Sequence, residues 1–464
     1  MINVLHVFPL IGGGVLGTDW LKFNGESIDN LETAFSLSGA KANEAAVRNN
    51  TTIDIKYWDE EFNDVDCDCV TCNPDKKDYN AECNRIDACL AKHQTVISKA
   101  DIILSIPPCN ALSALNASNE SRSGKDNPMS QIMIRCVEFA LKSGVPCFIF
   151  ENAPALSSKT GFPLLEQIAA KIENHFPRYS MNVVKTNSLY HGTGQKRSRT
   201  FVYLWKTDGA PLLDFDLEIS DLSEVLGDIS FDGSTYTSKP QNKKQEFLRG
   251  CSLGLDVSFA KDEKLYERWS SIFKVIPPEK FSSRIRGEFF KSLSTDDLED
   301  LIKLIECDLD LTKELKMVRH IHTKVNMDKN YWSYTPLFTE DKKLGIKCTD
   351  SIIGKNMGRI FHPEYPRCLT VREECRMMGI PDDYEIDNKS YNMIGQNVPA
   401  FTFAAQIKQL IKFFANENKT TEYRYLFTFI NENKVTHYSG NNILAAMNKK
   451  KEYKENLHNK IKEL

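Results

Sequence analysis

Short apolar runs alternate with amphipathic segments over the first 205 residues of the chain. Residues 2–11 form an apolar run that ends in three glycines. Further strand candidates lie at 53–58, 100–106, 145–150, 180–185 and 200–205. Apolar side chains at helical spacing fill residues 131–142 and 163–174 between them. Strands that alternate with helices predict one doubly wound α/β domain over residues 1–205, with a mostly parallel sheet.

The pattern changes after Trp205. Residues 208–232 are rich in Asp and Glu, and Thr295 precedes apolar side chains spaced along one helix face. We therefore predict a separate, smaller domain over residues 206–360. The alternation of apolar helix and loop resumes from about 361, with a helix at 401–414. Residues 415–464 are polar and predict a peripheral extension, most simply a solvated helix.

The composition narrows the class of protein. The chain has 464 residues, 41% of them hydrophobic and 26% charged, which is typical of a folded protein of two or three domains. A net charge of −4 by itself argues against a simple nucleic-acid binder. No apolar run approaches the ~18 residues of a membrane span, and the N-terminus lacks the basic leader of a signal peptide. The odd count of 13 cysteines predicts reduced thiols in a cytoplasm-like compartment.

Two polar groups follow neighbouring predicted strands. Cys109 comes after two prolines just past the strand at 100–106, where nucleophiles of α/β sheets gather. It is equally consistent with a small buried thiol. Glu151 and Asn152 end the next strand, and a carboxyl group beside a thiolate would have a raised pKa that suits it to donate a proton. The alternative for Glu151 is a surface acid that caps the following helix.

Arg197 and Arg199 alternate at the start of the strand at 200–205. Residues two apart in a strand point to one face, so this pair predicts a clamp for a phosphate or a polar base edge. The alternative is an ordinary solvated, basic edge strand.

The order of these motifs resembles that of the DNA (cytosine-5) methyltransferases. A glycine turn, Pro-Pro-Cys, Glu-Asn and Gln-x-Arg-x-Arg follow one another in the family's order. Two further blocks strengthen the resemblance, one from Arg367 to Glu373, continuing to Pro381, and one from Ile394 to Pro399. The resemblance covers roughly residues 1–205 and 360–412 and implies a Rossmann-like class I methyltransferase sheet.

The resemblance also implies a mechanism. Cys109 would attack C6 of a cytosine, and Glu151 would hold and protonate N3 while C5 takes a methyl group from S-adenosylmethionine. Asn152 would position the Glu151 loop, and Arg197 and Arg199 would bind the base carbonyl and a neighbouring phosphate. Because C6 is buried in a duplex, the base would have to be flipped out.

The resemblance also implies a binding site for S-adenosylmethionine. Its expected residues are Phe8, Gly12, Gly13, Gly17, Trp58, Asp59, Pro108, Asn397 and Val398. Glu44 or Glu60 are alternatives to Asp59 as the ribose acceptor. The chain departs from the family pattern at four positions, which put cofactor affinity and pocket shape in question: Leu10 for glycine, Asn110 for Gln, Ala153 for Val and Gln396 for Asn.

A Cys-rich insertion at about 60–95 adds a candidate metal site. It contains the soft ligands Cys67, Cys69, Cys72, Cys83, Cys89 and His93. The Cys69-x2-Cys72 spacing is that of a zinc knuckle. We expect Cys69, Cys72, Cys83 and Cys89 to hold a structural zinc, and a set of unrelated reduced thiols is the alternative.

Taken together, the motifs predict a DNA cytosine C5-methyltransferase that acts on double-stranded DNA. Residues 206–360 would be its target-recognition domain and 361–414 the C-terminal part of its catalytic domain. Candidate phosphate contacts are Lys243, Lys244, Arg249, Arg284 and Arg286. The alternatives are a tRNA cytosine-5 methyltransferase, as in one branch of the family, and a catalytically silent DNA-binding relative. We expect a cytoplasmic monomer in a prokaryotic or phage-infected cell, with a restriction endonuclease encoded separately.

Overall fold

The computed structural model of the chain describes most residues of the predicted α/β domain and of the C-terminal region. The described residues are 2–10, 12–23, 28–36, 47, 50–58, 67–70, 72–73, 75, 80–109, 112, 127–227, 338–341, 343–352, 371–385, 391–431 and 434–449. Asp59, Glu44, Glu60, Asn110, the predicted helix near 298–305 and the five candidate phosphate contacts lie outside them.

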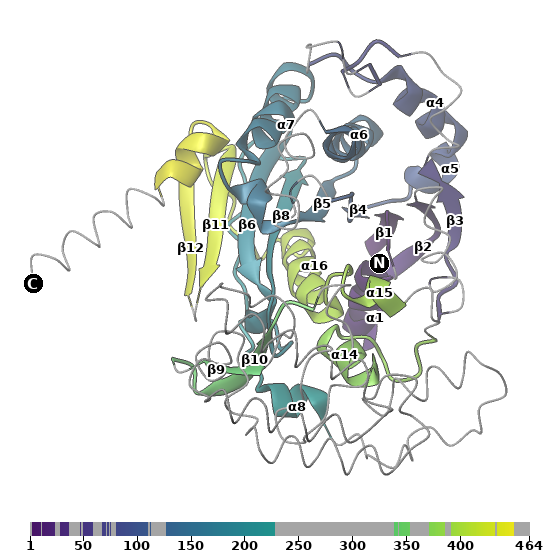
Figure 1. Cartoon of the computed structure of the whole chain (residues 1–464). Coiled ribbons are helices and arrows are strands. Elements are labelled where there is room, and N and C mark those ends of the chain that lie inside the picture. Colours follow the sequence, from purple (N-terminus) through teal and green to yellow (C-terminus); the bar gives the residue numbers. More distant parts are fainter. Residues whose placement is uncertain are drawn as a thin grey trace, which may run out of the picture.

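A central sheet forms the middle layer of the molecule (Figure 1). Its described strands are β1 (Ile2–Val7), β2 (Ile28–Ser36), β3 (Asp54–Tyr57), β4 (Ile102–Ser105), β5 (Cys147–Asn152), β6 (Ser180–Asn187), β8 (Ser198–Trp205), β11 (Tyr425–Asn431) and β12 (Lys434–Gly440), in the order β12-β11-β6-β8-β5-β4-β1-β2-β3. Strands β3, β2, β1, β4 and β5 are parallel, whereas β8 runs antiparallel to both β5 and β6. This is the sheet order of a class I methyltransferase, so the expected fold class is confirmed.

Helices cover both faces of the sheet (Figure 1). One face carries α4 (Asn84–Lys92), α5 (Gln94–Ile97), α6 (Pro128–Ser143) and α7 (Phe162–His175), and the other carries α1 (Gly13–Phe23) and α16 (Ala400–Phe414). Successive strand residues point to opposite faces, so Ile103 packs under the first group while Ile102 and Leu104 pack under α16. Both faces are buried, which explains the nearly continuous apolar runs of these strands.

The C-terminal region contributes two strands to the sheet. β11 pairs in parallel with β6, and β12 returns antiparallel beside it. Tyr425, Leu426 and Phe427 are buried there, and the Tyr425 hydroxyl donates to Glu173 at 2.6 Å. The expected solvated helix was therefore wrong for residues 425–440, because a six-residue apolar run within this polar stretch completes the sheet edge.

A second, smaller sheet lies below the edge of the central one (Figure 1). It consists of β7 (Gln195–Lys196), β10 (Ile346–Asp350) and β9 (Phe338–Asp341), in that order. Asp221, which caps α8 (Leu222–Leu226), also accepts the Lys347 backbone N–H at 2.7 Å. The chain segments on either side of residues 228–337 are thus joined to each other.

The first described residues of the region 206–360 pack on the main sheet. Leu213 and Phe215 belong to the apolar core under α16. The remaining helices are α14 (Val371–Met377) and α15 (Tyr391–Ile394), with 3-10 turns at Pro154–Ser157 and Ser188–Tyr190. Among the described residues, no helix combines the length and apolarity needed to cross a bilayer.

Candidate active site

Cys109 lies just past the carboxyl end of β4. β4 ends at Ser105, and Pro107 and Pro108 carry the chain from there to Cys109, which is half-buried. Its backbone carbonyl accepts the N–H of Leu112 at 2.9 Å, which closes a turn around the thiol. Burial raises the pKa of the Cys109 thiol, the nearby Glu151 raises it further, and Arg199 and Arg197 lower it. The thiol therefore shares its electrostatic environment with all three charged groups that the sequence predicted.

Glu151 lies on the neighbouring strand β5 and is buried, with 3% of its surface exposed. Its Oε1 lies 2.6 Å from Arg199 Nε and forms an ion pair with it. The angle does not make this contact a hydrogen bond, and no other described residue donates one to this oxygen. Burial raises the pKa of the carboxyl group, and the charges of Arg199 and Arg197 offset only part of the shift. Glu151 therefore retains a proton to higher pH than a solvated glutamate does.

Asn152 holds the turn that follows Glu151. Its side-chain carbonyl accepts the backbone N–H of Ala153 at 2.9 Å, and its amide nitrogen lies 3.6 Å from the sulfur of Met133 on α6. The side chain is fully buried. The expected role in positioning the loop is consistent with these contacts.

The two arginines have different surroundings. Arg199 is ion-paired with Glu151, and 16% of its side chain is exposed. Arg197 is completely buried, and its guanidinium donates to the backbone carbonyls of Ile352, Gly395 and Asn397. Arg197 precedes β8, and its two terminal nitrogens donate to main-chain acceptors, whereas Arg199 alone pairs with Glu151. The substrate clamp stays a prediction for both arginines.

Gln195, like Arg197, connects the active-site strands to later parts of the chain. Its amide nitrogen donates to the Met377 carbonyl at 2.8 Å, and its carbonyl oxygen accepts the Ile352 N–H at 3.4 Å. Gln195 and Arg197 thus join the strand region of the site to segments that lie more than 150 residues later in the sequence.

The expected cofactor side begins at the carboxyl end of β1. Phe8 and Trp58 lie with ring centroids 5.1 Å apart and are 3% and 1% exposed. Trp58 also contacts Phe35 and Phe139 edge-on. The structure therefore brings these two predicted residues together, within an aromatic cluster of the core.

The turn between β1 and α1 has an unusual backbone. Phe8 and Leu10 have φ angles of 56° and 52°, in the left-handed region that glycine enters most easily, and Gly12 has a φ of 88°. Leu10 stands where the family resemblance implies a glycine, and its positive φ is one that glycine would adopt without strain. Such a conformation costs about 1–2 kcal/mol for a non-glycine residue and requires support from the surroundings.

The start of α1 lies directly against the segment that contains Asn397 and Val398. A Cβ atom on Gly13 would come within 2.5 Å of the Val398 carbonyl oxygen and 2.6 Å of the Asn397 amide nitrogen. One on Gly17 would come within 2.9 Å of Phe403 Cβ on α16. The structure thus gathers four of the predicted cofactor residues and gives Gly13 and Gly17 a packing role as well.

A family model of C-5 cytosine-specific DNA methylases matches residues 62–412. This range contains Cys109, Glu151, both arginines and the Asn397 segment. The chain belongs to the C-5 cytosine-specific DNA methylase family. The glycine turn at residues 8–17 precedes the matched range.

Comparisons with individual proteins place this methylase among distant relatives. It is 22% identical over 459 residues to DNA (cytosine-5)-methyltransferase 2 of Arabidopsis thaliana, a match that covers 88% of this chain and 29% of the relative. It is 39% identical over 61 residues to a putative type II methyltransferase of Methanocaldococcus jannaschii, covering 12% of this chain and 20% of that protein. The chain thus spans less than a third of either relative's length.

Among solved structures, the similarity is also distant. A putative DNA modification methyltransferase encoded within an E. coli prophage is 15% identical, with a TM-score of 0.46. That alignment covers 89% of this methylase and 100% of the other chain.

Membership in this family implies S-adenosylmethionine, and the described residues fit such a ligand. Asn397 is fully buried beside Gly13, and neither atom of its side-chain amide has a hydrogen-bond partner among the described residues. Buried polar groups usually have a partner, so the amide offers a donor and an acceptor at the start of α1. The Val398 carbonyl lies at the same point against Gly13, whereas Gly12 lies near Tyr384 and Phe8 packs on Trp58. Pro108 immediately precedes Cys109.

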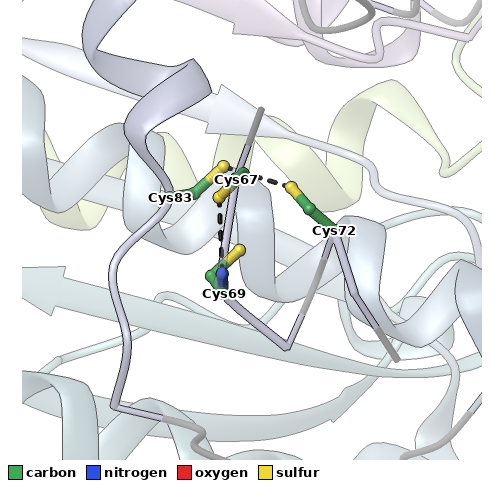
Figure 2. Close-up of side chains that lie close together, drawn as sticks. All are labelled: Cys67, Cys69, Cys72 and Cys83. Carbon is green, nitrogen blue, oxygen red and sulfur yellow. Dashed lines mark hydrogen bonds between the residues drawn. The ribbon is translucent and has the colours of Figure 1, made fainter. Parts of the chain in front are cut away.

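The methylase also contains a cluster of cysteines after β3. Cys67, Cys69, Cys72 and Cys83 have sulfur atoms that all lie within 4.8 Å of one another (Figure 2). Cys67 therefore stands in the cluster in place of the expected Cys89. Cys83 immediately precedes α4 and its sulfur belongs to the cluster, whereas Cys89 lies further along α4 and its sulfur is not part of it. Because their sulfurs are so close, Cys69 has a lowered pKa while those of Cys72 and Cys83 are raised.

Proposed function

We propose that this chain is a DNA cytosine C5-methyltransferase that modifies a flipped-out cytosine through a covalent bond between Cys109 and C6. The observation that carries the proposal is the joint position of Cys109, Glu151 and Arg199 at one edge of the sheet. They come from the ends of β4, β5 and β8, which are adjacent in the sheet. A nucleophile, a proton donor and a cation that holds the donor are the groups that addition to a pyrimidine requires.

The chemistry of the chain's own residues follows from their environments. Cys109 loses its proton and its sulfur bonds to C6, while Glu151 gives a proton to N3, so that C5 becomes electron-rich. S-adenosylmethionine, when bound, supplies the methyl group. Water in the site then takes the proton from C5, the sulfur leaves as the thiolate, which takes up a proton again, and N3 returns its proton to Glu151, which restores the aromatic ring. Arg199 keeps the Glu151 carboxylate paired after it has given up its proton.

The pKa directions fit this division of roles. The raised pKa lets Glu151 keep its proton to higher pH than an ordinary glutamate, which is the direction that a proton donor requires. A raised pKa also makes the Cys109 thiolate scarce before substrate binds, which protects it from unwanted reactions. The proton of Cys109 is therefore expected to leave when the substrate enters the site.

The substrate and partners belong to the same proposal. Double-stranded DNA is favoured because the family that the chain matches is named for DNA methylation. Residues between the described segments 221–227 and 338–352 would supply target recognition. A separately encoded restriction endonuclease and action as a monomer complete the proposal.

Covalent trapping tests the function directly. The full chain is incubated with S-adenosylmethionine and duplex DNA that contains 5-fluorocytosine, and the products are resolved under denaturing conditions. We expect an adduct that Cys109→Ser and Cys109→Ala abolish, while both variants keep the unfolding transition of the wild type. Parallel incubations with radiolabelled S-adenosylmethionine compare duplex DNA with tRNA. Label in tRNA alone would overturn the DNA proposal, and DNA binding without any adduct would favour a silent relative.

A further inference from the structure

The four clustered cysteines are arranged as the ligands of one metal ion. Three of them, Cys67, Cys69 and Cys72, belong to the segment after β3, and the fourth, Cys83, immediately precedes α4 (Figure 2). In a tetrahedral zinc site with Zn–S bonds of about 2.3 Å, sulfur atoms lie roughly 3.8 Å apart. The observed sulfurs all lie within 4.8 Å of one another, and Cys72 and Cys83 are 3.4 Å apart. That distance is too long for a disulfide.

The cluster is closed to solvent on its inner side. Cys69 and Cys83 are fully buried, and Cys67 and Cys72 are half-buried. The Cys69 N–H donates to the Cys67 sulfur at 3.5 Å, and the backbone turns so that the N–H groups of Cys72 and Asn73 both donate to the Cys69 carbonyl. A short turn of this kind brings the two sulfurs of a Cys-x2-Cys pair to one ion.

The surroundings provide positive charge for a thiolate-rich site. Arg135, on α6, donates to the Cys72 sulfur at 3.2 Å. Four thiolates around a divalent cation carry two net negative charges, which a donor of this kind stabilises.

The backbone at the fourth ligand, Cys83, is held in place by a buried ion pair between α6 and α7. Glu138 of α6 accepts the backbone N–H of Cys83, and its other oxygen forms an ion pair with Lys171 of α7 at 2.9 Å. Lys171 in turn donates to the Ala81 carbonyl at 3.1 Å, and both charged side chains are fully buried. A buried ion pair of this kind fixes the backbone before Cys83 to two core helices.

We propose that Cys67, Cys69, Cys72 and Cys83 bind one structural Zn²⁺, which pins residues 67–83 to α6 and α7. Four protein ligands leave no open position for water or substrate, so the ion has a structural role. The sequence of this segment is rich in polar residues, so metal binding supplies much of its folding energy. The same helix α6 contacts Asn152 through Met133, which links the zinc site to the active-site loop.

Metal content tests the proposal without reference to methyl transfer, so its outcome is separate from that of the proposed function. The full chain, purified under reducing conditions without chelator, is expected to contain about one zinc per chain by mass spectrometry of the metal. Cys67→Ser is expected to lose the zinc, whereas the matched variant Cys89→Ser retains it. Replacement by Co²⁺ should give the thiolate charge-transfer and tetrahedral d–d absorption bands of a CoS4 centre.

A second measurement covers variants that fold poorly. Chelation of the wild type should lower its resistance to urea and increase protease cleavage between residues 67 and 83, and added ZnCl2 should reverse both effects. Substoichiometric zinc together with 13 titratable thiols in the unfolded wild type would overturn the proposal, as would iron in place of zinc. Equal loss of metal from Cys67→Ser and Cys89→Ser would overturn the assigned ligand set.

Discussion

Arg197→Ala is expected to destabilise the fold much more than Arg199→Ala, although the family resemblance assigns both arginines to the substrate. Arg197 is completely buried and donates to three main-chain carbonyls. Arg199 is partly exposed and pairs with one carboxylate. The first arginine therefore joins parts of the protein, and the second acts within the site.

The three hydrogen bonds of Arg197 determine how much stability its removal should cost. Removing Arg197 leaves the carbonyls of Ile352, Gly395 and Asn397 without this donor, and each buried acceptor left unsatisfied costs about 1–3 kcal/mol. Removing the buried cation offsets part of this destabilisation, because a desolvated charge is itself unfavourable. We expect a net loss of about 3–5 kcal/mol in the free energy of unfolding, as when a buried charged partner is removed. Arg197→Lys should fall between the wild type and Arg197→Ala, since one ammonium group cannot match the guanidinium fork.

Urea unfolding followed by tryptophan fluorescence measures the effect. The matched control Arg199→Ala should lose less stability than Arg197→Ala, because the buried Glu151 carboxyl that it leaves unpaired can take up a proton, yet it should abolish adduct formation. Near-wild-type stability of Arg197→Ala, combined with loss of activity, would refute the reasoning and return Arg197 to the substrate site.

Three further changes test other parts of the structure. Glu151→Gln should lower methyl transfer by about 10²–10⁴-fold. Because burial raises the folded-state pKa of Glu151 above its unfolded value of about 4.3, the wild type should lose stability as pH rises between those two values, and the variant should lack this loss in urea titrations. Gly17→Ala should destabilise by about 1–3 kcal/mol, since its Cβ would meet Phe403, and a gain in stability of the kind seen at exposed helix positions would contradict that contact. Ending the chain at Phe414 should remove at least about 5 kcal/mol of apolar burial by β11, so a soluble truncated protein with an unchanged urea midpoint would show the hairpin to be dispensable.

The elements that the sequence predicted are those whose signals are local. β1, β4 and β5 are apolar runs bounded by glycine, proline or polar residues, and the alternation of strands and helices set the fold class. β2 gave no such signal, because polar residues occupy much of its first half and are only partly buried there. β11 was missed because its apolar run lies in a polar stretch, and its burial depends on pairing with β6 across more than 200 residues.

The residues of the active site also fall into those that nearby sequence predicts and those that depend on distant partners. Cys109 and Glu151 follow strands directly, so their position at the sheet edge could be predicted from residues nearby. The partners of Arg197 lie 155 to 200 residues further along the chain, and nothing around Arg197 indicates them. Spacing alone also could not choose between Cys67 and Cys89, since that choice depends on where α4 begins and which of its faces is buried.

The segment from Gly395 to Val398 connects the two halves of the proposed chemistry. Its Gly395 and Asn397 carbonyls accept hydrogen bonds from Arg197, two residues before Arg199, which pairs with Glu151. The Asn397 side chain and the Val398 carbonyl form the surface against which Gly13 packs at the start of α1. This four-residue segment, in which all but Gln396 are buried, thus fixes the strand that presents the Glu151 partner relative to the turn that we expect to bind S-adenosylmethionine. Rigid placement of two reacting groups lowers the entropic cost of bringing them together, which accounts for the link between chain segments that lie nearly 400 residues apart.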